Sequence, residues 1–374
     1  MSVVKFSEVA HRANTKEDRF NTDKIYYVGG EHIEPGELFI HDKGVIKGST
    51  IGPMFYCGFK SGQILFVTRN PHLRKCSVAE FDGICSEKTF VIETIDERIL
   101  LQEYLASVML SDDFWNYCEE NKSGGVNYFL NWSTLADYEF ELPSVEEQKA
   151  ISDKVWAAYR LKESYKKLLA ATEEMVKSQF IEMFAPYPYV PLSYYVSSLI
   201  GGRSLDGGTA NSNRVLKTGS VSYNYFVESE YKFLPDDYVP NEAHKVKIGD
   251  VIISRMNTPE YVGACAYVSC LSHDVYLPDR LWKVEIKENV HPIFLWQSLI
   301  QDSSRMQIKK LASGTSNSMK NISKNNLLGI FVKEVPICEQ MKFVEIYKQA
   351  DKSGFELRKS IDAIDAVIKS LVNS

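Results

Sequence analysis

The side chains best suited to nucleic-acid chemistry gather between residues 303 and 324, a stretch with five basic side chains and no acidic one. Base edges are read chiefly by Arg, Lys, Asn and Gln, whereas phosphates accept hydrogen bonds from any cation or hydroxyl. The stretch therefore predicts a DNA-binding surface, although a solvated basic helix end would have the same composition. Its candidate contacts are Arg305, Lys309, Lys310, Thr315, Ser316, Asn317, Lys320, Asn321 and Lys324.

Two further loops follow short apolar runs that each begin with glycine, at residues 62–67 and 249–254. Turns at strand ends often have the same polar composition, so both a DNA contact and an ordinary turn remain open. The candidate contacts in these loops are Arg69, Arg74, Lys75, Arg255 and Asn257.

A third candidate is the Gly-rich segment that contains Arg203 and ends at Arg214. It lacks the Gly-Lys-Ser/Thr ending of a phosphate-binding loop. We interpret it as a flexible loop that becomes ordered on DNA.

Motifs of catalysis are missing from the chain. It has no Asn/Asp-Pro-Pro-Tyr/Phe element, no Walker A motif and no H-E-x-x-H. The seven histidines are scattered, and the seven cysteines contain no CxxC pair, which favours buried, reduced thiols in a cytoplasmic protein. We therefore expect no catalytic residue, no metal site, no cofactor and no membrane segment.

The formal net charge of −6 argues mildly against nucleic acid as a partner, but the charge is unevenly distributed. Residues 1–143 carry a net charge of −8, whereas residues 185–336 carry +2. Any contact with DNA must therefore come from local clusters or from a partner protein.

The chain contains an internal duplication with offsets of 186 to 193 residues. The glycine-led runs correspond to each other, and Ser123-Gly124 and Asn131 correspond to Ser313-Gly314 and Asn321. Leu-Pro-Ser-Val-Glu-Glu-Gln148 matches Val-Pro-Ile-Cys-Glu-Gln340 near the end of each half.

A long helix is expected after each Pro…Glu-Gln element, and Ser144 with Glu147 forms a capping box for the first. Apolar residues recur in steps of three and four, which is typical of a coiled coil. The second helix has one seam: Phe343, Tyr347, Ala350, Gly354, Leu357, Ile361, Ile364, Ile368 and Leu371. The first has a seam of Ile151, Val155, Ala158, Tyr165, Leu169 and Val176, and an adjoining one of Ala157, Leu161, Leu168, Ala171 and Met175.

These elements predict a mixed α+β protein with a pseudo-twofold internal duplication. We expect two similar globular domains, residues 1–143 and 185–336, and two long antiparallel coiled-coil helices, residues 144–184 and 337–374.

This layout resembles the specificity (S) subunits of type I restriction–modification systems over the whole chain. The most specific motifs are Gly-Asp-Val-Ile-Ile-Ser254, Ser313-Gly-Thr-Ser-Asn-Ser-Met-Lys-Asn-Ile322 and the Pro…Glu-Gln helix entries. The resemblance implies that each globular half is a target-recognition domain reading half of a split target in double-stranded DNA. It also implies two methyltransferase (modification) subunits as partners, with two restriction subunits in the complete complex, acting in DNA methylation and phage defence.

Three alternatives stay open. The chain could serve a two-subunit restriction enzyme whose partner carries both nuclease and methyltransferase. It could be a lone nuclease that uses Asp112, Asp113, Glu119 and Glu120, which we interpret instead as a solvated helix face. It could also be a structural coiled-coil protein without a role on DNA.

Overall fold

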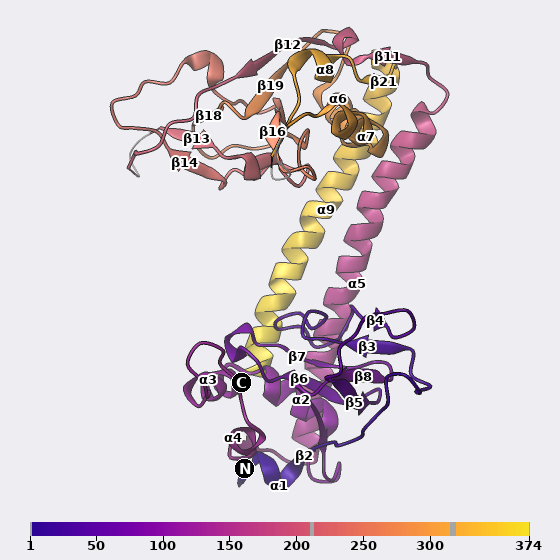
Figure 1. Cartoon of the computed structure of the whole chain (residues 1–374), viewed down its shortest axis with the longest axis vertical. Helices are drawn as coiled ribbons and strands as arrows, with labels where there is room; N and C mark the ends of the chain where they lie inside the picture. The colour runs from indigo at the N-terminus through magenta and orange to yellow at the C-terminus, as the bar shows by residue number, and fades with distance from the viewer. Residues whose placement is uncertain (1, 210–212, 315–318, 374) are drawn as a thin grey trace. The chain divides into compact units, whose positions relative to one another are not determined.

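The computed structural model describes residues 2–209, 213–314 and 319–373. The chain divides into two compact units (Figure 1). Unit 1 comprises residues 1–169 and 356–374, and unit 2 comprises residues 170–355. Two long helices, α5 (Val145–Phe184) and α9 (Ile337–Val372), each contribute one end to each unit.

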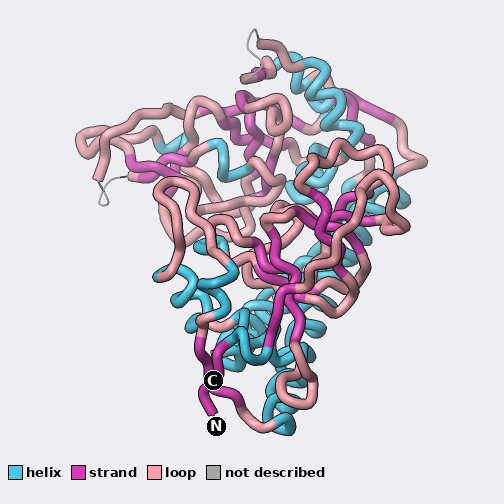
Figure 2. The backbone as a smooth tube through the Cα atoms, turned by 60° about the horizontal axis from the view of Figure 1, so that its bottom comes forward, coloured by secondary structure: helices cyan, strands magenta, loops and turns pink. Residues whose placement is uncertain are grey.

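Unit 1 is built from short strands and helices joined by long loops (Figure 2). Its strands are β1 (Ser2–Lys5), β2 (Ala10–Arg12), β3 (Tyr26–Val28), β4 (Gly44–Val45), β5 (Phe55–Phe59), β6 (Ile64–Val67), β7 (Cys76–Val78), β8 (Gly83–Ser86), β9 (Thr89–Thr94) and β10 (Glu139–Leu142). Its short helices are α1 (Phe6–Val9), α2 (Gln102–Leu110), α3 (Asp112–Glu120) and α4 (Trp132–Ala136).

Unit 2 repeats much of this order of elements, with β16 and β20 added and no counterpart of β5. Its strands are β11 (Tyr189–Pro191), β12 (Val196–Gly201), β13 (Arg214–Leu216), β14 (Tyr231–Phe233), β15 (Val251–Ser254), β16 (Met256–Asn257), β17 (Cys265–Tyr267), β18 (Val275–Tyr276), β19 (Leu281–Ile286), β20 (Lys320–Asn321) and β21 (Phe331–Lys333). Its short helices are α6 (Pro292–Ile300), α7 (Asp302–Leu311) and α8 (Lys324–Leu328).

The sheet topology confirms the internal duplication. The four-stranded sheet β2-β9-β6-β7 of unit 1 has its counterpart in β12-β19-β15-β17 of unit 2. In a second sheet, β3 pairs parallel with β8 and antiparallel with β4, and β13 makes the same two kinds of pairing with β18 and β14. The pair β1-β10 likewise corresponds to β11-β21.

One residue correspondence expected from the sequence is wrong. Ser123 pairs with Phe129 in unit 1, and Ser313 pairs with Asn321 in unit 2, so Asn321 corresponds to Phe129 rather than to Asn131. Asn131 instead occupies the N-cap position of α4, where Ser323 stands in α8. The segment between the paired residues is two residues longer in unit 2 than in unit 1. The sequence comparison assumed one constant offset between the halves here and so could not reveal this insertion.

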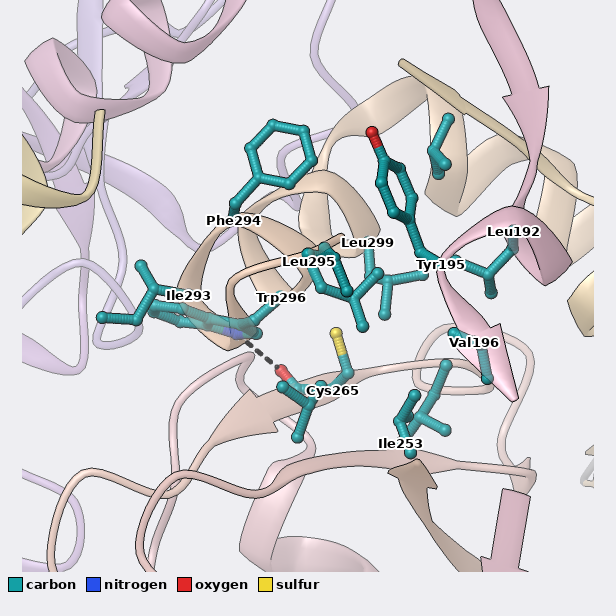
Figure 3. Packing of buried hydrophobic residues seen from close by; sticks show 14 of the residues in the cluster. Leu192, Tyr195, Val196, Ile253, Cys265, Ile293, Phe294, Leu295, Trp296 and Leu299 are labelled. Carbon is teal, nitrogen blue, oxygen red and sulfur yellow. Dashed lines mark hydrogen bonds between the residues drawn. The ribbon is translucent and has the colours of Figure 1, made fainter. Parts of the chain in front are cut away.

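Each unit has its own hydrophobic core, in which the helices α2 or α6 pack on the four-stranded sheet. In unit 2 the residues of α6 lie over Ile253 and Cys265 of the sheet, and Leu192, Tyr195 and Val196 close one side (Figure 3). The ends of both long helices join these cores. Val155 and Ile368 belong to the core of unit 1, and Phe180 and Phe343 belong to that of unit 2.

The entry into each long helix follows the sequence expectation. Ser144 Oγ accepts a hydrogen bond from the Glu147 backbone N–H (3.3 Å), and Glu147 Oε2 accepts one from the Ser144 backbone N–H (3.0 Å). This reciprocal pair confirms the predicted capping box of α5.

The glutamine of each Pro…Glu-Gln element is fully buried and ties its helix to the loop before α2 or α6. The Gln148 amide donates to the carbonyls of Ile99 (2.8 Å) and Pro143 (3.0 Å) and accepts from the Leu101 N–H (2.9 Å). Gln340 makes the same three bonds in unit 2, to the Asn289 and Val335 carbonyls and from the His291 N–H. The repeated motif therefore has a structural cause, because its glutamine bonds to three backbone groups in each unit.

The helix seams are only partly as expected. All residues of the seam in α9, and the first seam in α5, are buried or half-buried, which confirms both. The prediction of an adjoining seam in α5 is wrong, because Leu161, Leu168 and Met175 are 44%, 53% and 48% exposed. Lys162 and Glu163 are buried in its place.

Buried charge next to α5 is compensated within unit 1. The Lys162 ammonium lies 2.9 Å from Glu37 Oε1 and 2.6 Å from Asp365 Oδ1 of α9, and Lys166 lies 2.8 Å from the same Glu37 oxygen. His41 contacts Glu163 at 2.8 Å. None of the described helices has the length and apolar composition needed to cross a lipid bilayer.

Candidate nucleic-acid interface

Two segments that the sequence proposed separately as DNA contacts meet in unit 2. Strand β16 follows β15 directly and pairs antiparallel with β20, with Met256 opposite Asn321 and Asn257 opposite Lys320. We call residues 255–257 and 320–321 the unit 2 ladder. The ladder brings Arg255, directly before β16, and Lys320, on β20, to neighbouring segments, where both can donate to phosphates or base edges.

Arg255 is held at the start of this ladder. Its guanidinium lies over the Trp282 ring at 5.3 Å from the centroid, and its Nε is 3.5 Å from Asn321 Oδ1. No described carboxylate lies within ion-pair distance of it. An arginine stacked on an aromatic ring keeps its outer donors oriented for an incoming acceptor.

Lys320 and Lys324 are also anchored here. Lys320 Nζ donates to the Gly314 carbonyl (3.0 Å), and Lys324 Nζ donates to the Leu199 carbonyl (2.6 Å). Each ammonium has three donors, so donors remain beside the single bond given for each. Lys309 and Lys310 stand exposed in the last turn of α7. Three other expected contacts, Thr315, Ser316 and Asn317, lie outside the described residues.

Asn257 has a different environment from the one expected of a base-reading amide, since it is 9% exposed. Its Nδ2 lies 3.4 Å from Ser222 Oγ and 3.5 Å from Ser254 Oγ, and its Oδ1 accepts the Thr258 N–H (2.8 Å). These bonds fix the loop that follows β16, so the geometry favours a positioning role for Asn257.

Arg305 is turned toward the protein. Its Nη2 donates to the Glu260 carbonyl (3.0 Å), while Nη1 is buried without a hydrogen-bond partner among the described residues. Burial lowers the pKa of the Arg305 guanidinium. The side chain supports the loop at 258–263 from beneath rather than extending into solvent.

Unit 1 has a smaller equivalent of the ladder. Arg69 pairs with Phe129, and its guanidinium lies 5.4 Å from the centre of that ring. The Leu130 N–H donates to the Thr68 carbonyl, as the Ile322 N–H donates to the Arg255 carbonyl in unit 2. Arg69 therefore occupies the position of Met256, one residue beyond that of Arg255. Arg69 is exposed and has no described carboxylate within ion-pair distance.

The two cations after Arg69 have partners inside unit 1. Arg74 Nη1 lies 2.5 Å from Asp112 Oδ1, and Lys75 Nζ donates to the Gly30 carbonyl (2.5 Å). The Arg74 guanidinium hydrogen-bonds to Asp112 and thereby lowers the pKa of that carboxyl. Lys122 pairs with Glu119 at 2.7 Å, so part of the acidic face of α3 is neutralised by neighbouring cations.

The remaining two expected contacts belong to another part of unit 2. Arg203 is exposed, and its backbone N–H donates to the Leu277 carbonyl (3.1 Å). The Arg214 guanidinium, on β13, lies over the rings of Tyr231 (5.3 Å) and Phe233 (5.8 Å). The nearby Gly202 and Gly208 approach the carbonyls of Leu277 and Leu234 so closely that a Cβ would collide with them. Packing therefore explains these glycines.

The sequence analysis missed three tyrosines beside the unit 2 ladder, Tyr223, Tyr225 and Tyr261. Their rings contact one another, and the first two are 61% and 58% exposed. The pattern Tyr-Asn-Tyr was the available signal, because two large aromatic side chains around an asparagine indicate a turn that exposes rings.

The described residues include no group of three or more side chains suited to binding a metal ion. Cys76, Cys85, Cys118 and Cys265 are buried as expected, but Cys270 and Cys338 are exposed, so the expectation of burial is wrong for those two. Cys270 lies in the loop after β17, and Cys338 is the second residue of α9.

Comparisons with known proteins bear mainly on the fold. No protein-family model matches the chain. Over 150 residues, 40% of the chain, it is 23% identical to the specificity subunit of the type I restriction enzyme EcoEI of Escherichia coli. The match spans a quarter of that protein's length.

Two solved structures match nearly the whole chain. The S subunit of a type I restriction–modification system from M. genitalium aligns with a TM-score of 0.60 and 12% identity, over 99% of this chain and 94% of that one. A chain from a study of assembly and conformational transition of a type I system aligns with a TM-score of 0.57 and 18% identity, over 99% and 96%. The chain thus has the fold of a type I specificity subunit, as its sequence predicted.

Proposed function

We propose that the chain is the DNA sequence-specificity subunit of a type I restriction–modification complex, and that each unit reads one half of a bipartite DNA target. The observation that carries this proposal is the repeated topology with an arginine just after the equivalent strand in both units, at positions one residue apart. Arg69 and Arg255 follow equivalent strands, β6 and β15, and each lies on an aromatic ring. Two similar reading surfaces in one chain suit a target made of two half-sites.

The division of labour inside each unit follows from the geometry. Arg69 in unit 1 and Arg255, Lys309, Lys310 and Lys320 in unit 2 carry donors toward DNA. Asn257 and Arg305 position the loop after β16, because their polar atoms bond to protein groups. We assign the two DNA-reading domains to residues 1–143 and 185–336, the limits expected from the sequence.

The long helices are the proposed docking surface for partner proteins. Leu161 and Leu168 are seven residues apart on α5 and exposed, so an apolar stripe remains on the helix outside its seam with α9. Such a stripe accepts another helix in the manner of a coiled coil. We assign it to the methyltransferase subunits, two per complex, with two restriction subunits completing the assembly in the cytoplasm; the chain itself performs no catalysis.

The test is methylome sequencing of a host that expresses the chain with its neighbouring methyltransferase, compared with the same host lacking this gene. A bipartite methylated motif that disappears with the gene and returns on complementation is the expected result. Methylation that is unchanged by the deletion, with the subunits shown to be expressed and assembled, would contradict the proposal.

A variant with Leu161 and Leu168 both changed to Glu adds a test of docking. It should lose co-purification with the methyltransferase, while the variant Lys154→Glu on the same helix keeps it. Equal co-purification of both variants would exclude this stripe as the docking surface.

A further inference from the structure

Three tyrosine rings form one surface cluster in unit 2. Tyr223 and Tyr225 stack with their ring centroids 6.0 Å apart and an interplanar angle of 23°. Tyr261 meets Tyr223 edge-on, at 5.8 Å and 73°. With the first two rings 61% and 58% exposed, this tyrosine cluster presents adjoining aromatic rings to solvent.

Asn224 holds the two exposed tyrosines in place. It has a left-handed backbone conformation (φ 63°), which asparagine tolerates better than most residues. Its carbonyl accepts the Trp296 indole N–H (3.1 Å), and its Oδ1 accepts the Cys265 N–H (3.4 Å). Trp296 belongs to the core and also donates to the Cys265 carbonyl (Figure 3).

These bonds have a consequence for the neighbours of Asn224. Because the middle residue of the Tyr-Asn-Tyr turn is tied to the core, the residues on both sides of it direct their rings outward. A tyrosine loses few rotamers on binding, and a ring that is already fixed loses fewer still. The cluster is therefore prepared to bind a partner rather than left over from an incomplete core.

The cluster is attached to the candidate DNA interface at two points. Ser222, which precedes Tyr223, accepts the hydrogen bond from Asn257 Nδ2 (3.4 Å). The Tyr261 N–H donates to the carbonyl of Thr258, in the loop that directly follows β16 (3.0 Å). The rings thus adjoin the strand that pairs with Lys320 of the unit 2 ladder.

The charge near the rings indicates which part of DNA they meet. The Glu260 carboxylate is near enough to raise the pKa of the Tyr261 phenol. An anion at this place repels phosphates, whereas base edges carry no net charge. Aromatic and methyl-bearing side chains read the C5-methyl group of thymine through apolar contact in the major groove.

We propose that Tyr223 and Tyr225 are specificity-determining residues of unit 2, and that their rings contact the thymine methyl groups of the half-site that this unit reads. The inference rests on the proposed function, since it requires that unit 2 reads DNA. It adds two residues that act by apolar contact with thymine methyl groups, beside the ladder cations, which act through charge.

The test uses the complete complex with its methyltransferase and a library of duplexes that carry every single substitution of the methylated motif. Tyr223→Ala and Tyr225→Ala should each reduce discrimination at an A·T position of one half-site about ten-fold, within the usual range for one lost base contact. The other half-site stays unchanged. Tyr225→Phe should behave as wild type, because it keeps the ring.

Tyr189→Ala is the matched control. Tyr189 also belongs to unit 2 and is 57% exposed, but its ring contacts Lys333 rather than the cluster. It should leave discrimination at every position unchanged. Thermal unfolding of all four variants should match that of the wild type, because exposed rings contribute little to stability.

Deoxyuridine, which lacks the thymine methyl group, isolates the proposed contact. Placed at the affected position, it should slow methylation by the wild-type complex about as much as Tyr225→Ala does. It should slow the Tyr225→Ala complex no further. The salt dependence of DNA binding should not change, because tyrosine releases no counterion.

Three results would overturn the inference while the proposed function stands. They are discrimination by the alanine variants equal to that of the Tyr189→Ala control, a loss confined to a G·C position, and a uniform loss across all sequences. A wild-type complex without any bipartite preference would instead show that the proposed function fails, and the inference fails with it.

Discussion

At the scale of single residues, the buried glutamines explain why the same short motif stands at the start of both long helices. Gln340 is fully buried, and its amide bonds to the Asn289 and Val335 carbonyls and to the His291 N–H. An apolar side chain of similar size fills the space but removes all three bonds. The Val335 carbonyl keeps its bond from the Tyr195 hydroxyl (3.3 Å), so the bonds lost at the Asn289 carbonyl and the His291 N–H determine the cost.

Gln340→Leu should therefore lower the free energy of unfolding by about 2 kcal/mol, the usual cost of leaving buried polar groups unsatisfied. Urea denaturation of the full chain measures this. Gln349→Leu, at an exposed position of the same helix, should change stability by less than about 0.5 kcal/mol. Equal effects of the two substitutions would show that the three bonds do not determine the cost.

Cys57 is the residue whose reactivity the structure alters most clearly. It stands directly opposite Cys85 across β5 and β8. A hydrogen bond with the Cys85 thiol and the nearby Arg12 guanidinium lower the pKa of Cys57 to about 7, although partial burial opposes this shift. Since the thiolate is the nucleophile, Cys57 should react at a lower pH than an ordinary thiol.

Iodoacetamide labelling followed by mass spectrometry tests this prediction. The rate at Cys57 should rise with pH and reach half of its maximum near pH 7. Cys85→Ala removes the hydrogen bond and should move that midpoint upward. A midpoint at Cys57 that Cys85→Ala leaves unchanged would refute the assignment.

At the scale of elements, the ion pairs around Lys162 fix which face of α5 turns inward in unit 1. Burial disfavours the charged ammonium, but hydrogen bonds with Asp365 and Glu37 outweigh it and raise the pKa of Lys162. Burial also acts on Glu37, yet bonds from Lys166 and Lys162 lower the pKa of that carboxyl. Lys162 of α5 thus joins Glu37 to Asp365, which lies on α9. Its removal is costly because both carboxylates then lose the Lys162 ammonium.

Lys162→Ala should destabilise the chain by about 3 kcal/mol in urea denaturation, because the buried Glu37 carboxylate then keeps only Lys166 as a cation. Lys166→Ala should cost less than about 1 kcal/mol, since the Lys166 side chain is 44% exposed and Lys162 remains on Glu37. The stability from the pair is present above the ordinary carboxyl pKa of 4.5 and is lost as the pH falls through the lowered pKa of Glu37. A difference between wild type and Lys162→Ala that persists unchanged in acid would contradict this account.

The same lysine shows where prediction from the sequence stops. The sequence could predict the capping box of α5, the Pro…Glu-Gln entry into each long helix and one seam per helix, because these are local patterns. The choice between two apolar stripes on α5 could not, because it depends on Glu37 and Asp365, which are far from Lys162 in the sequence. An apolar count favours Leu161 and Leu168, but the ion pairs bury Lys162 instead.

The candidate interface has the same limit. The types of its residues could be predicted, since Arg, Lys and Asn suit contact with DNA. Their directions could not, because the pairing of β16 with β20 joins residues more than sixty positions apart. Only that pairing places Arg255 beside Asn321, and only packing turns Arg305 beneath the loop at 258–263.

At the scale of the whole molecule, the proposed function and the duplication together predict that the two units read DNA independently. Arg69 and Arg255 have no partner in common, because one lies on Phe129 in unit 1 and the other on Trp282 in unit 2. Substitutions at sites without shared partners usually have additive effects on free energy. In the assembled complex, their effects on DNA recognition should therefore multiply.

Arg69→Ala and Arg255→Ala should each weaken binding of the target duplex by the assembled complex about ten-fold, within the range of one lost charged contact, and the double variant about a hundred-fold. Each single variant should relax positions in a different half-site. Arg98→Ala, which removes an 89% exposed side chain paired only with Asp96 among the described residues, is the control and should bind as the wild type does. A double variant that binds no more weakly than either single variant would mean that the two units share one recognition site. Relaxation of the same half-site by both single variants would mean the same. Either result would require us to abandon the proposal that a duplicated chain reads a split target.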